Sequence, residues 1–316
     1  MAAAARLAAR ARPQSAPNPG VGAILVRDGV VIARGWTQAG GRPHAEAMAL
    51  SGLGEDGAKG AALYVTLEPC AHDSARGPAC TDLVIAARPQ RVIIGQLDPD
   101  PRTAGLGLKR IERAGIAASL IEDDASAASL AGYFARAHLS RPHVTLKLAM
   151  SLDGAIALGD GTSQWITGEI ARAHVHAMRA RQDAILVGGG TWRADKPRLD
   201  VRLPGLEGRS PQRVLLTRGV APDGVRVINH PAQIETIEGA QYLYIEGGAA
   251  TAASFLAADL VDEIHLYRAP IIIGAGRASV GDIGLAQLSS AHGRWKLAER
   301  RQLGSDEFTA YLRTRV

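Results

Sequence analysis

Short apolar runs alternate with helical segments along the chain, and this alternation restricts the fold more than any other feature. In the first half the expected strands are 21–26, 30–33, 63–67 and 91–94, between helices expected at 2–11, 44–50, 80–87, 106–114 and 126–139. In the second half the expected strands are 143–148, 183–187, 213–217, 242–246 and 263–268, with helices at 169–181 and 249–258. Short buried strands between helices are typical of a largely parallel sheet with both faces covered. The sequence therefore predicts an α/β protein.

The length of 316 residues corresponds to about two domains. The best boundary is Arg141-Pro142, because it follows a predicted helix and precedes a new alternating strand. We expect one domain over residues 1–141 and a second over 142–316. Apolar residues make up 47% of the chain, which is enough for two buried cores.

Composition excludes several functional classes. The net charge of +5 comes from scattered arginines, and aromatic residues are only 4%, so neither a basic patch nor a stacking surface for nucleic acid is expected. No apolar run reaches the ~18 residues of a membrane span. The acid-free, arginine-containing segment 1–27 has the composition of a transit peptide, but a first helix at 2–11 is the better interpretation, and we expect a cytoplasmic protein.

The two cysteines are too few for a disulfide framework and instead combine with a histidine. His44 lies at the start of one predicted helix, Cys70 follows a strand in Thr-Leu-Glu-Pro-Cys, and Cys80 begins another helix. One imidazole and two thiolates suit a zinc ion that keeps its fourth position for water, and zinc lowers the pKa of that water toward ~7. The alternative is a helix-capping histidine beside two buried, apolar cysteines.

Glu46 is two residues beyond His44, so it can approach the same water without binding the metal. His-x-Glu followed by Pro-Cys is the pattern of zinc-dependent nucleobase deaminases, in which the glutamate carries protons. Many such enzymes have two residues between the cysteines, whereas nine lie between Cys70 and Cys80. We interpret this insertion as a substrate-binding loop in which Arg76 either meets a phosphate or is only solvated.

The second half contains two strand–glycine–helix junctions, at 188–191 and at Gly247-Gly248. Glycines at such junctions let backbone N–H groups approach a phosphate, although tight turns alone would explain them equally well. Neither junction is a Gly-x-Gly-x-x-Gly or a Walker motif.

The ordered set of motifs resembles the bifunctional RibD family of riboflavin biosynthesis. The matching segments are Ala16 to Gly22, Pro43-His44-Ala45-Glu46, Thr66 to His72, Asp98 to Gly107, Lys147 to Gly154, Ser163 to Thr167, Arg179 to Asp195, Glu246 to Gly248 and Ala269-Pro270. The resemblance implies a cytidine-deaminase-like three-layer domain followed by a dihydrofolate-reductase-like domain. It also implies zinc, NADPH, a pyrimidine ribosyl phosphate as the small-molecule substrate, and a homo-oligomer.

The resemblance also implies a division of site residues. His44, Cys70 and Cys80 would bind the metal, and Glu46 would be catalytic. NADPH would be held by Ala149, Trp165, Thr191, Asp195, Gly248, Ala249, Ala250, Thr251, Ala252, Ala253 and Ser254. Substrate would be held by Asn18, Ser163, Arg179, Leu199, Arg202 and Glu246.

Several of these roles have a structural alternative. Arg179 could form a helix-face ion pair with Glu169 or Asp183, and Trp165 could be a core residue. Asn18 could be a turn residue. Lys147 and Asp153 flank the end of a predicted strand and could polarise the substrate or form an ion pair.

Two rival functions remain at this point. A deaminase acting on RNA predicts a compact Cys-x-x-Cys and a basic, aromatic groove, and the sequence has neither. The other rival keeps the zinc deaminase but makes the second half a nucleotide-binding regulatory module without hydride transfer.

Overall fold

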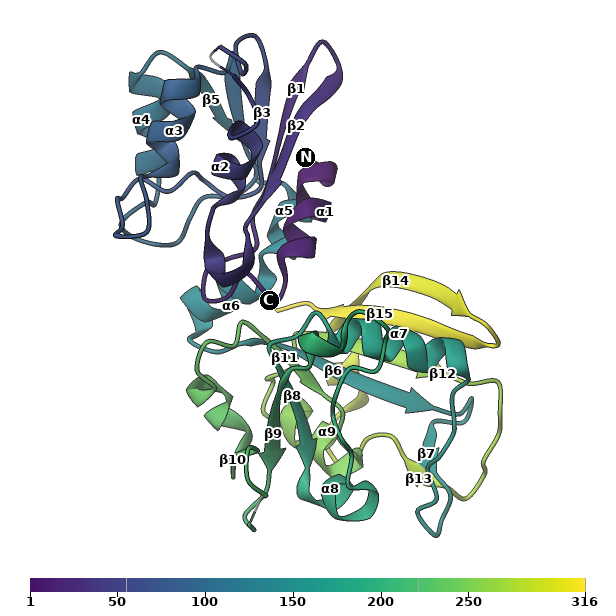
Figure 1. The fold of residues 1–316 in the computed structure, drawn as a ribbon. Coiled ribbons are helices and arrows are strands. Elements are labelled where there is room, and N and C mark those ends of the chain that lie inside the picture. The colour runs from purple at the N-terminus through teal and green to yellow at the C-terminus, as the bar shows by residue number, and fades with distance from the viewer. Residues whose placement is uncertain (55, 221, 316) are drawn as a thin grey trace. The chain divides into compact units, whose positions relative to one another are not determined.

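The protein consists of two compact units, each with its own sheet (Figure 1). The computed structural model describes residues 1–54, 56–220 and 222–315. The first unit is Met1–Ser140 and the second begins at Arg141. Since each unit has separate hydrophobic clusters, each is described on its own terms.

The sheet of the first unit has the strand order β2-β1-β3-β4-β5. Its strands are β1 (Gly22–Arg27), β2 (Val30–Trp36), β3 (Ala62–Val65), β4 (Arg91–Ile94) and β5 (Ala117–Leu120). The expected hairpin is confirmed, because β1 and β2 are antiparallel and joined by Asp28 and Gly29, both with positive φ. The sheet is mixed rather than largely parallel, since β1 is antiparallel to both neighbours and only β3, β4 and β5 run together.

Helices cover both faces of this sheet, which makes the unit a three-layer structure. They are α1 (Ala2–Ala11), α2 (Ala45–Leu50), α3 (Cys80–Ala87), α4 (Leu106–Arg113), α5 (Asp124–Ser129) and α6 (Ala131–Leu139). Figure 1 shows α2, α3 and α4 on one face and α1 with α5 on the other. The helix expected at 126–139 is two helices, because Leu130 (φ −105°, ψ 6°) leaves the helical conformation.

The expected first helix is confirmed and belongs to the folded unit. Ala4, Leu7 and Ala8 of α1 are buried against the sheet. Gly22 of β1 makes this close approach possible, because a Cβ there would lie 2.0 Å from the carbonyl oxygen of Ala4.

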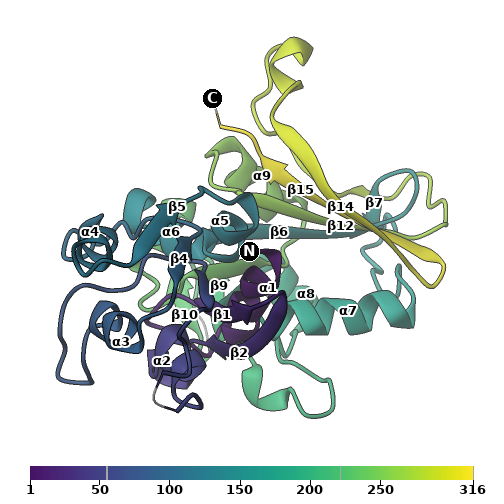
Figure 2. The ribbon, with the colours of Figure 1, turned by 90° about the horizontal axis from the view of Figure 1, so that it is seen from above.

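The second unit has an eight-stranded sheet with the order β10-β9-β8-β11-β6-β12-β15-β14. The bounds are β6 (His143–Met150), β8 (Ala184–Gly188), β9 (Gln212–Leu216), β10 (Arg226–Ile228), β11 (Tyr242–Ile245), β12 (Glu263–Arg268), β14 (Trp295–Leu303) and β15 (Asp306–Arg313). A separate pair joins β7 (Ala155–Ala157) and β13 (Arg277–Ala278). The six strands from β10 to β12 are parallel, as expected, and the β14–β15 hairpin, yellow in Figure 2, extends the sheet antiparallel beside β12.

Three α-helices of the second unit are described: α7 (Glu169–Arg179), α8 (Gly189–Asp195) and α9 (Ala249–Ala257). Because β8, β9, β11 and β6 are parallel, their carboxyl ends lie at one edge of the sheet. Ligands of open α/β sheets bind at this edge. Among the described residues, no helix is long and apolar enough to cross a membrane.

Candidate functional site

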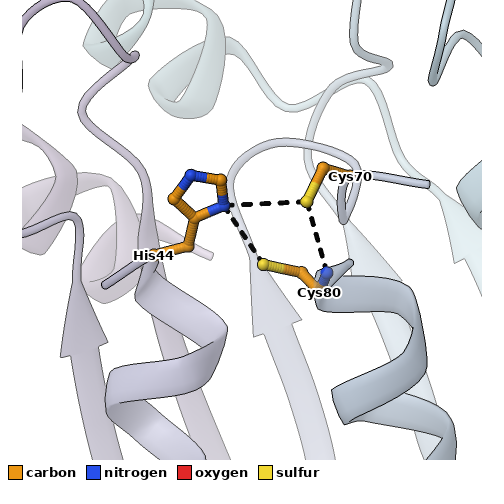
Figure 3. A group of neighbouring side chains, drawn as sticks. All are labelled: His44, Cys70 and Cys80. Carbon is orange, nitrogen blue, oxygen red and sulfur yellow. Dashed lines mark hydrogen bonds between the residues drawn. The ribbon is translucent and has the colours of Figure 1, made fainter. Parts of the chain in front are cut away.

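Three side chains from separate elements of the first unit converge on one point (Figure 3). His44 is the N-cap of α2, Cys70 lies in the loop after β3, and Cys80 is the first residue of α3. The imidazole Nδ1 of His44 lies 3.2 Å from the sulfur of Cys80 and 3.7 Å from that of Cys70. The three ligand atoms lie within 4.8 Å of one another, although Cys70 and Cys80 are separated by a nine-residue loop.

The donor set fits a zinc ion. A tetrahedral ion with Zn–S near 2.3 Å and Zn–N near 2.0 Å places a nitrogen and a sulfur ligand about 3.5 Å apart. The observed nitrogen–sulfur separations bracket this value, so only small side-chain adjustments are needed. Three protein ligands of this kind leave a fourth position for water or substrate, as in catalytic zinc sites.

Glu46 is buried in the first turn of α2, 3% exposed, and its carboxyl group faces the same sulfurs. Burial raises the pKa of Glu46 to about 7 because a carboxylate loses its hydration there, while the nearby imidazole of His44 acts in the opposite direction. A buried carboxyl group beside a metal ligand set is the arrangement expected of a proton carrier.

The pKa values of the two cysteine thiols are shifted in opposite directions. A hydrogen bond from the Cys80 thiol lowers the pKa of Cys70 to about 4, and the backbone N–H of Cys80 also donates to the Cys70 sulfur at 3.2 Å. The same hydrogen bond, together with burial, raises the pKa of Cys80 above its usual range. Cys70 is therefore the sulfur on which thiolate character concentrates.

Asn18 contacts the other side of the imidazole. Its amide nitrogen lies 2.9 Å from Nε2 of His44 and donates to the carbonyl oxygen of Gly41 at 2.9 Å. These contacts fix the ring so that Nδ1 faces the sulfurs. Arg76 of the loop between the cysteines is exposed and donates to the carbonyl oxygen of Gly40 at 2.9 Å, so it is held beside this site rather than only solvated.

A further set of hydrogen bonds, which the sequence did not predict, fixes the loop that carries Cys70. The carboxylate of Glu68 is 2% exposed and accepts hydrogen bonds from the backbone N–H groups of Gly105 (2.9 Å), Leu108 (2.9 Å) and Asp98 (3.3 Å). From the other side, the hydroxyl of Thr81 donates to the carbonyl oxygen of Cys70 at 2.6 Å. An acidic residue directly before Pro-Cys, in Thr-Leu-Glu-Pro-Cys, was the sequence feature that could have identified Glu68 as a residue that supports the site.

The second unit contains a cavity of about 1000 Å³ at the carboxyl ends of its parallel strands. It brings together nearly all of the residues expected there. The lining includes Ala149, Ser163, Trp165, Arg179, Thr191, Asp195, Leu199, Arg202, Glu246, Gly248, Ala249, Ala250, Thr251 and Ser254. Ala252 and Ala253 do not line it, because both are buried on the inner side of α9, and Ala252 packs in the hydrophobic core.

A buried ion pair lies within this cavity. The guanidinium of Arg179 donates to both carboxylate oxygens of Glu246, at 2.6 and 2.9 Å, and the ammonium group of Lys147 lies 3.8 Å from the same carboxylate. Burial is the largest single influence on Glu246 and would raise its pKa, but the charge and hydrogen bonds of Arg179, together with the charge of Lys147, outweigh it and hold that pKa at about 2. The alternative of a helix-face pair for Arg179 is wrong, because its ionic partner is neither Glu169 nor Asp183.

Trp165 is not a core residue, since it is 64% exposed and lines the cavity under the guanidinium of Arg172, at 4.7 Å. Asp153 is not among the lining residues. Its carboxylate accepts hydrogen bonds from the Ser151 hydroxyl (2.5 Å) and the Gly274 N–H (2.7 Å), so it anchors a loop. Lys147 does line the cavity, together with Arg179 and Glu246, which are expected to hold substrate.

The cavity also fits a dinucleotide. Its volume is at the upper end of ligand sites, as a cofactor and a substrate together require. The hydroxyl of Thr191 accepts a hydrogen bond from the N–H of Gly248 at 3.2 Å, which joins the two glycine junctions. A Cβ at Gly190 would meet no heavy atom within 4 Å, so the backbone there is open to a ligand.

Comparison with known families agrees with both sites. Residues 1–96 match the model of the cytidine and deoxycytidylate deaminase zinc-binding region, and residues 142–308 match that of the RibD C-terminal domain. The two matched segments contain the metal-ligand set and the cavity, respectively.

Relatives match over nearly the full length. The riboflavin biosynthesis protein RibD of Escherichia coli is 35% identical over 97% of this chain and 96% of that protein, and that of Aquifex aeolicus is 34% identical over 90% of each. The solved structure of Acinetobacter baumannii RibD covers 99% of this chain and 97% of its own, with 32% identity and a TM-score of 0.86. The Thermotoga maritima diaminohydroxyphosphoribosylaminopyrimidine deaminase/5-amino-6-(5-phosphoribosylamino)uracil reductase gives the same coverage and TM-score at 31% identity. The chain therefore belongs to the RibD family of bifunctional deaminase–reductases of riboflavin biosynthesis.

Proposed function

We propose that residues 1–141 remove the 2-amino group of 2,5-diamino-6-(5-phosphoribosylamino)pyrimidin-4(3H)-one by hydrolysis, and that residues 142–316 then reduce the ribosyl side chain to ribityl. The Thermotoga relative carries the names of both activities. The single observation that carries the proposal is the convergence of His44, Cys70 and Cys80 next to the buried carboxyl group of Glu46.

In the deaminase, Nδ1 of His44 and the sulfurs of Cys70 and Cys80 would hold zinc, which supplies hydroxide from a bound water near neutral pH. Glu46 takes one proton from the water and delivers it to the departing nitrogen. The C–N bond breaks, a C–O bond forms, and ammonia leaves. Asn18 holds the imidazole in place and, from its position beside the metal ligands, would contact the pyrimidine ring or its ribose.

In the reductase, Arg179 and Arg202 would bind the ribose 5-phosphate, because a guanidinium pairs with phosphate oxygens at two points. Ser163, Leu199 and Glu246 complete the substrate side. Ala149, Trp165, Thr191, Asp195 and residues 248–251 with Ser254 hold NADPH, which supplies the hydride. The residues of this cavity bring the two molecules together and exclude water.

We further propose a cytoplasmic homo-oligomer that acts on a small molecule and binds neither nucleic acid nor membrane. The full-length match to a riboflavin biosynthesis protein supports the small-molecule substrate. The rival in which the second unit only senses a nucleotide is not favoured, because that unit matches the RibD C-terminal domain.

Glu46→Gln tests the proposal. We expect zinc to stay at about one per chain, while ammonia release falls by about 10²-fold or more, since general acid–base catalysis is lost. NADPH oxidation with the deaminated intermediate is expected to be unchanged. Equal loss of both activities would contradict separate sites, and no NADPH oxidation in the wild type would favour the sensor.

A further inference from the structure

The second unit contains a further, smaller pocket beside the C-terminal end of α9. Its volume is about 200 Å³, and its lining comes from the end of α9, from the loop between β13 and β14, and from β14 and β15. Of the described residues, none lines both this pocket and the cavity of about 1000 Å³. The small pocket is therefore a separate space that the proposed reactions do not use.

Most of the small pocket has an apolar wall. Val261 is 1% exposed and belongs to the hydrophobic core of the second unit, and Leu256 and Trp295 pack against that core. The loop between β13 and β14 adds the apolar side chains of Ile283, Leu285 and Ala291. A wall of this kind that includes an indole favours an aromatic ligand, because aromatic rings pack well against one another.

Three charged side chains complete the lining: Asp259, Arg294 and Arg313. The Arg313 guanidinium donates to the Asp259 carboxylate at 2.8 Å, and Arg315 lies 3.8 Å from the same carboxylate. The Arg313 guanidinium also lies 5.8 Å from the centre of the Trp295 ring. Asp259 and Arg313 are therefore already paired with protein groups.

Arg294 is the lining cation that is left for a ligand. Its backbone carbonyl accepts a hydrogen bond from Arg313 at 3.1 Å, but its side chain has no hydrogen bond or ion pair with any residue that the structure describes. Asp282, in the same loop as Ile283, is not among the lining residues, and its carboxylate accepts from the N–H of Gly284 at 2.8 Å. The pocket thus has one unpaired positive charge beside an apolar wall.

The volume limits the size of the ligand. At about 30 Å³ per water molecule, the pocket has room for about seven waters. This is below the roughly 300 Å³ at which sites for drug-sized molecules begin. A single ring that carries one acidic group fits, whereas a nucleotide does not.

We propose that the small pocket binds an aromatic carboxylate, with its ring against Trp295 and Leu256 and its carboxylate on Arg294. A guanidinium pairs with both oxygens of a carboxylate, and this pairing is stronger than a neutral hydrogen bond. A cationic ligand of the same size would be repelled by Arg294. The inference does not depend on the deaminase or the reductase assignment, because it uses none of their residues.

Benzoate is the probe, titrated into the full chain with NADPH at saturation and followed by calorimetry and saturation-transfer NMR. We expect a dissociation constant of about 1 mM or tighter, the range of small single-ring ligands. Benzyl alcohol keeps the ring without the charge, and acetate keeps the charge without the ring. Each is expected to bind at least about 10-fold more weakly than benzoate, because each loses one of the two interactions.

Two variants place benzoate in the small pocket. Arg294→Gln is expected to weaken benzoate by about 10-fold or more, the effect of losing a charge-assisted pair. Ala291→Phe puts a larger side chain into the lining and is expected to abolish binding. Lys296→Gln is the matched control, because Lys296 is exposed on β14, two residues from Arg294, and lies outside the lining.

The control is expected to bind benzoate as the wild type does, and thermal unfolding verifies that all three variants are folded. Several results would overturn the inference: no benzoate binding at about 10 mM, equal binding of benzyl alcohol, the same loss in Lys296→Gln, or unchanged binding in a folded Arg294→Gln or Ala291→Phe chain.

Discussion

The two candidate sites are built in opposite ways. In the first unit, side chains at the amino ends of α2 and α3 and in one loop lie within 4.8 Å of each other around a single point. In the second unit, a cavity of about 1000 Å³ is lined by residues from 147 to 277. A hydrolytic step needs one metal and one proton carrier, whereas hydride transfer needs room for two molecules. The compact site therefore depends on exact ligand distances, and the open one depends on charge.

The two sites also differ in how their negatively charged side chains are paired. In the compact site the hydrogen bond from Cys80 lowers the pKa of Cys70, which favours a thiolate among the metal ligands. The open cavity neutralises its buried carboxylate, Glu246, with Arg179 and Lys147. Removal of one ligand side chain should therefore abolish metal binding in the first unit. Removal of one charged side chain from the cavity should only weaken ligand binding in the second unit.

Cys80→Ser gives the largest expected effect. Removal of one of three protein ligands is expected to lower the zinc content from about one per chain toward zero and ammonia release to background. NADPH oxidation on the deaminated intermediate should persist, because the cavity lies wholly in the second unit. Metal analysis and both assays on one preparation measure this, and a variant that keeps zinc and deaminates would break the comparison.

Arg179→Ala gives the next effect, on stability as well as activity. It leaves Glu246, whose side chain is 9% exposed, without its main partner, and breaking such a buried pair costs about 3 to 5 kcal/mol. We expect the free energy of unfolding of the second unit, measured by urea titration with nucleotide binding as the signal, to fall by this amount. We also expect kcat/KM for NADPH oxidation to fall.

Arg202→Ala is the matched variant, because its pair with Asp200 is exposed, at 47% for the arginine side chain. An exposed pair contributes about 0 to 1 kcal/mol, so this variant should lower kcat/KM with little change in unfolding. If both arginine variants destabilised the unit equally, the buried pair would have no special role.

Much of the fold was predictable because local patterns coincide with the packing. The limits of α1, α3, β4 and β12 follow the predicted ranges directly, since their apolar residues face a core with regular spacing. The β14–β15 hairpin was not predicted. Residues 296–302 of β14 include Lys296, Glu299 and Arg300 and are mostly exposed, so an edge strand of this kind shows no apolar alternation.

The two sites were predictable to different degrees, because residues in short motifs are visible in the sequence whereas pairings between distant residues depend on the fold. The ligand set lies in short motifs, and the structure brings it together across a loop of unusual length. In the cavity, Arg179 was identified, but its pairing with Glu246, 67 positions away, depends on the register of parallel strands. Ala252 and Ala253 were included because the motif is continuous in sequence, whereas a helix turns successive residues toward different sides.

Glu68→Gln sharpens the comparison at its finest level, because it changes no ligand. The neutral amide keeps the size of the side chain but weakens the three hydrogen bonds from the amides of Asp98, Gly105 and Leu108, so we expect the first unit to lose about 2 kcal/mol of stability and to release zinc faster. Glu112→Gln, at an exposed position of α4, the helix that contains Leu108, is the control and should change neither property. Thermal unfolding and zinc transfer to a chelator measure both. A Glu68→Gln chain that unfolds less readily than the control, or holds zinc as long, would show that the ligands alone position Cys70.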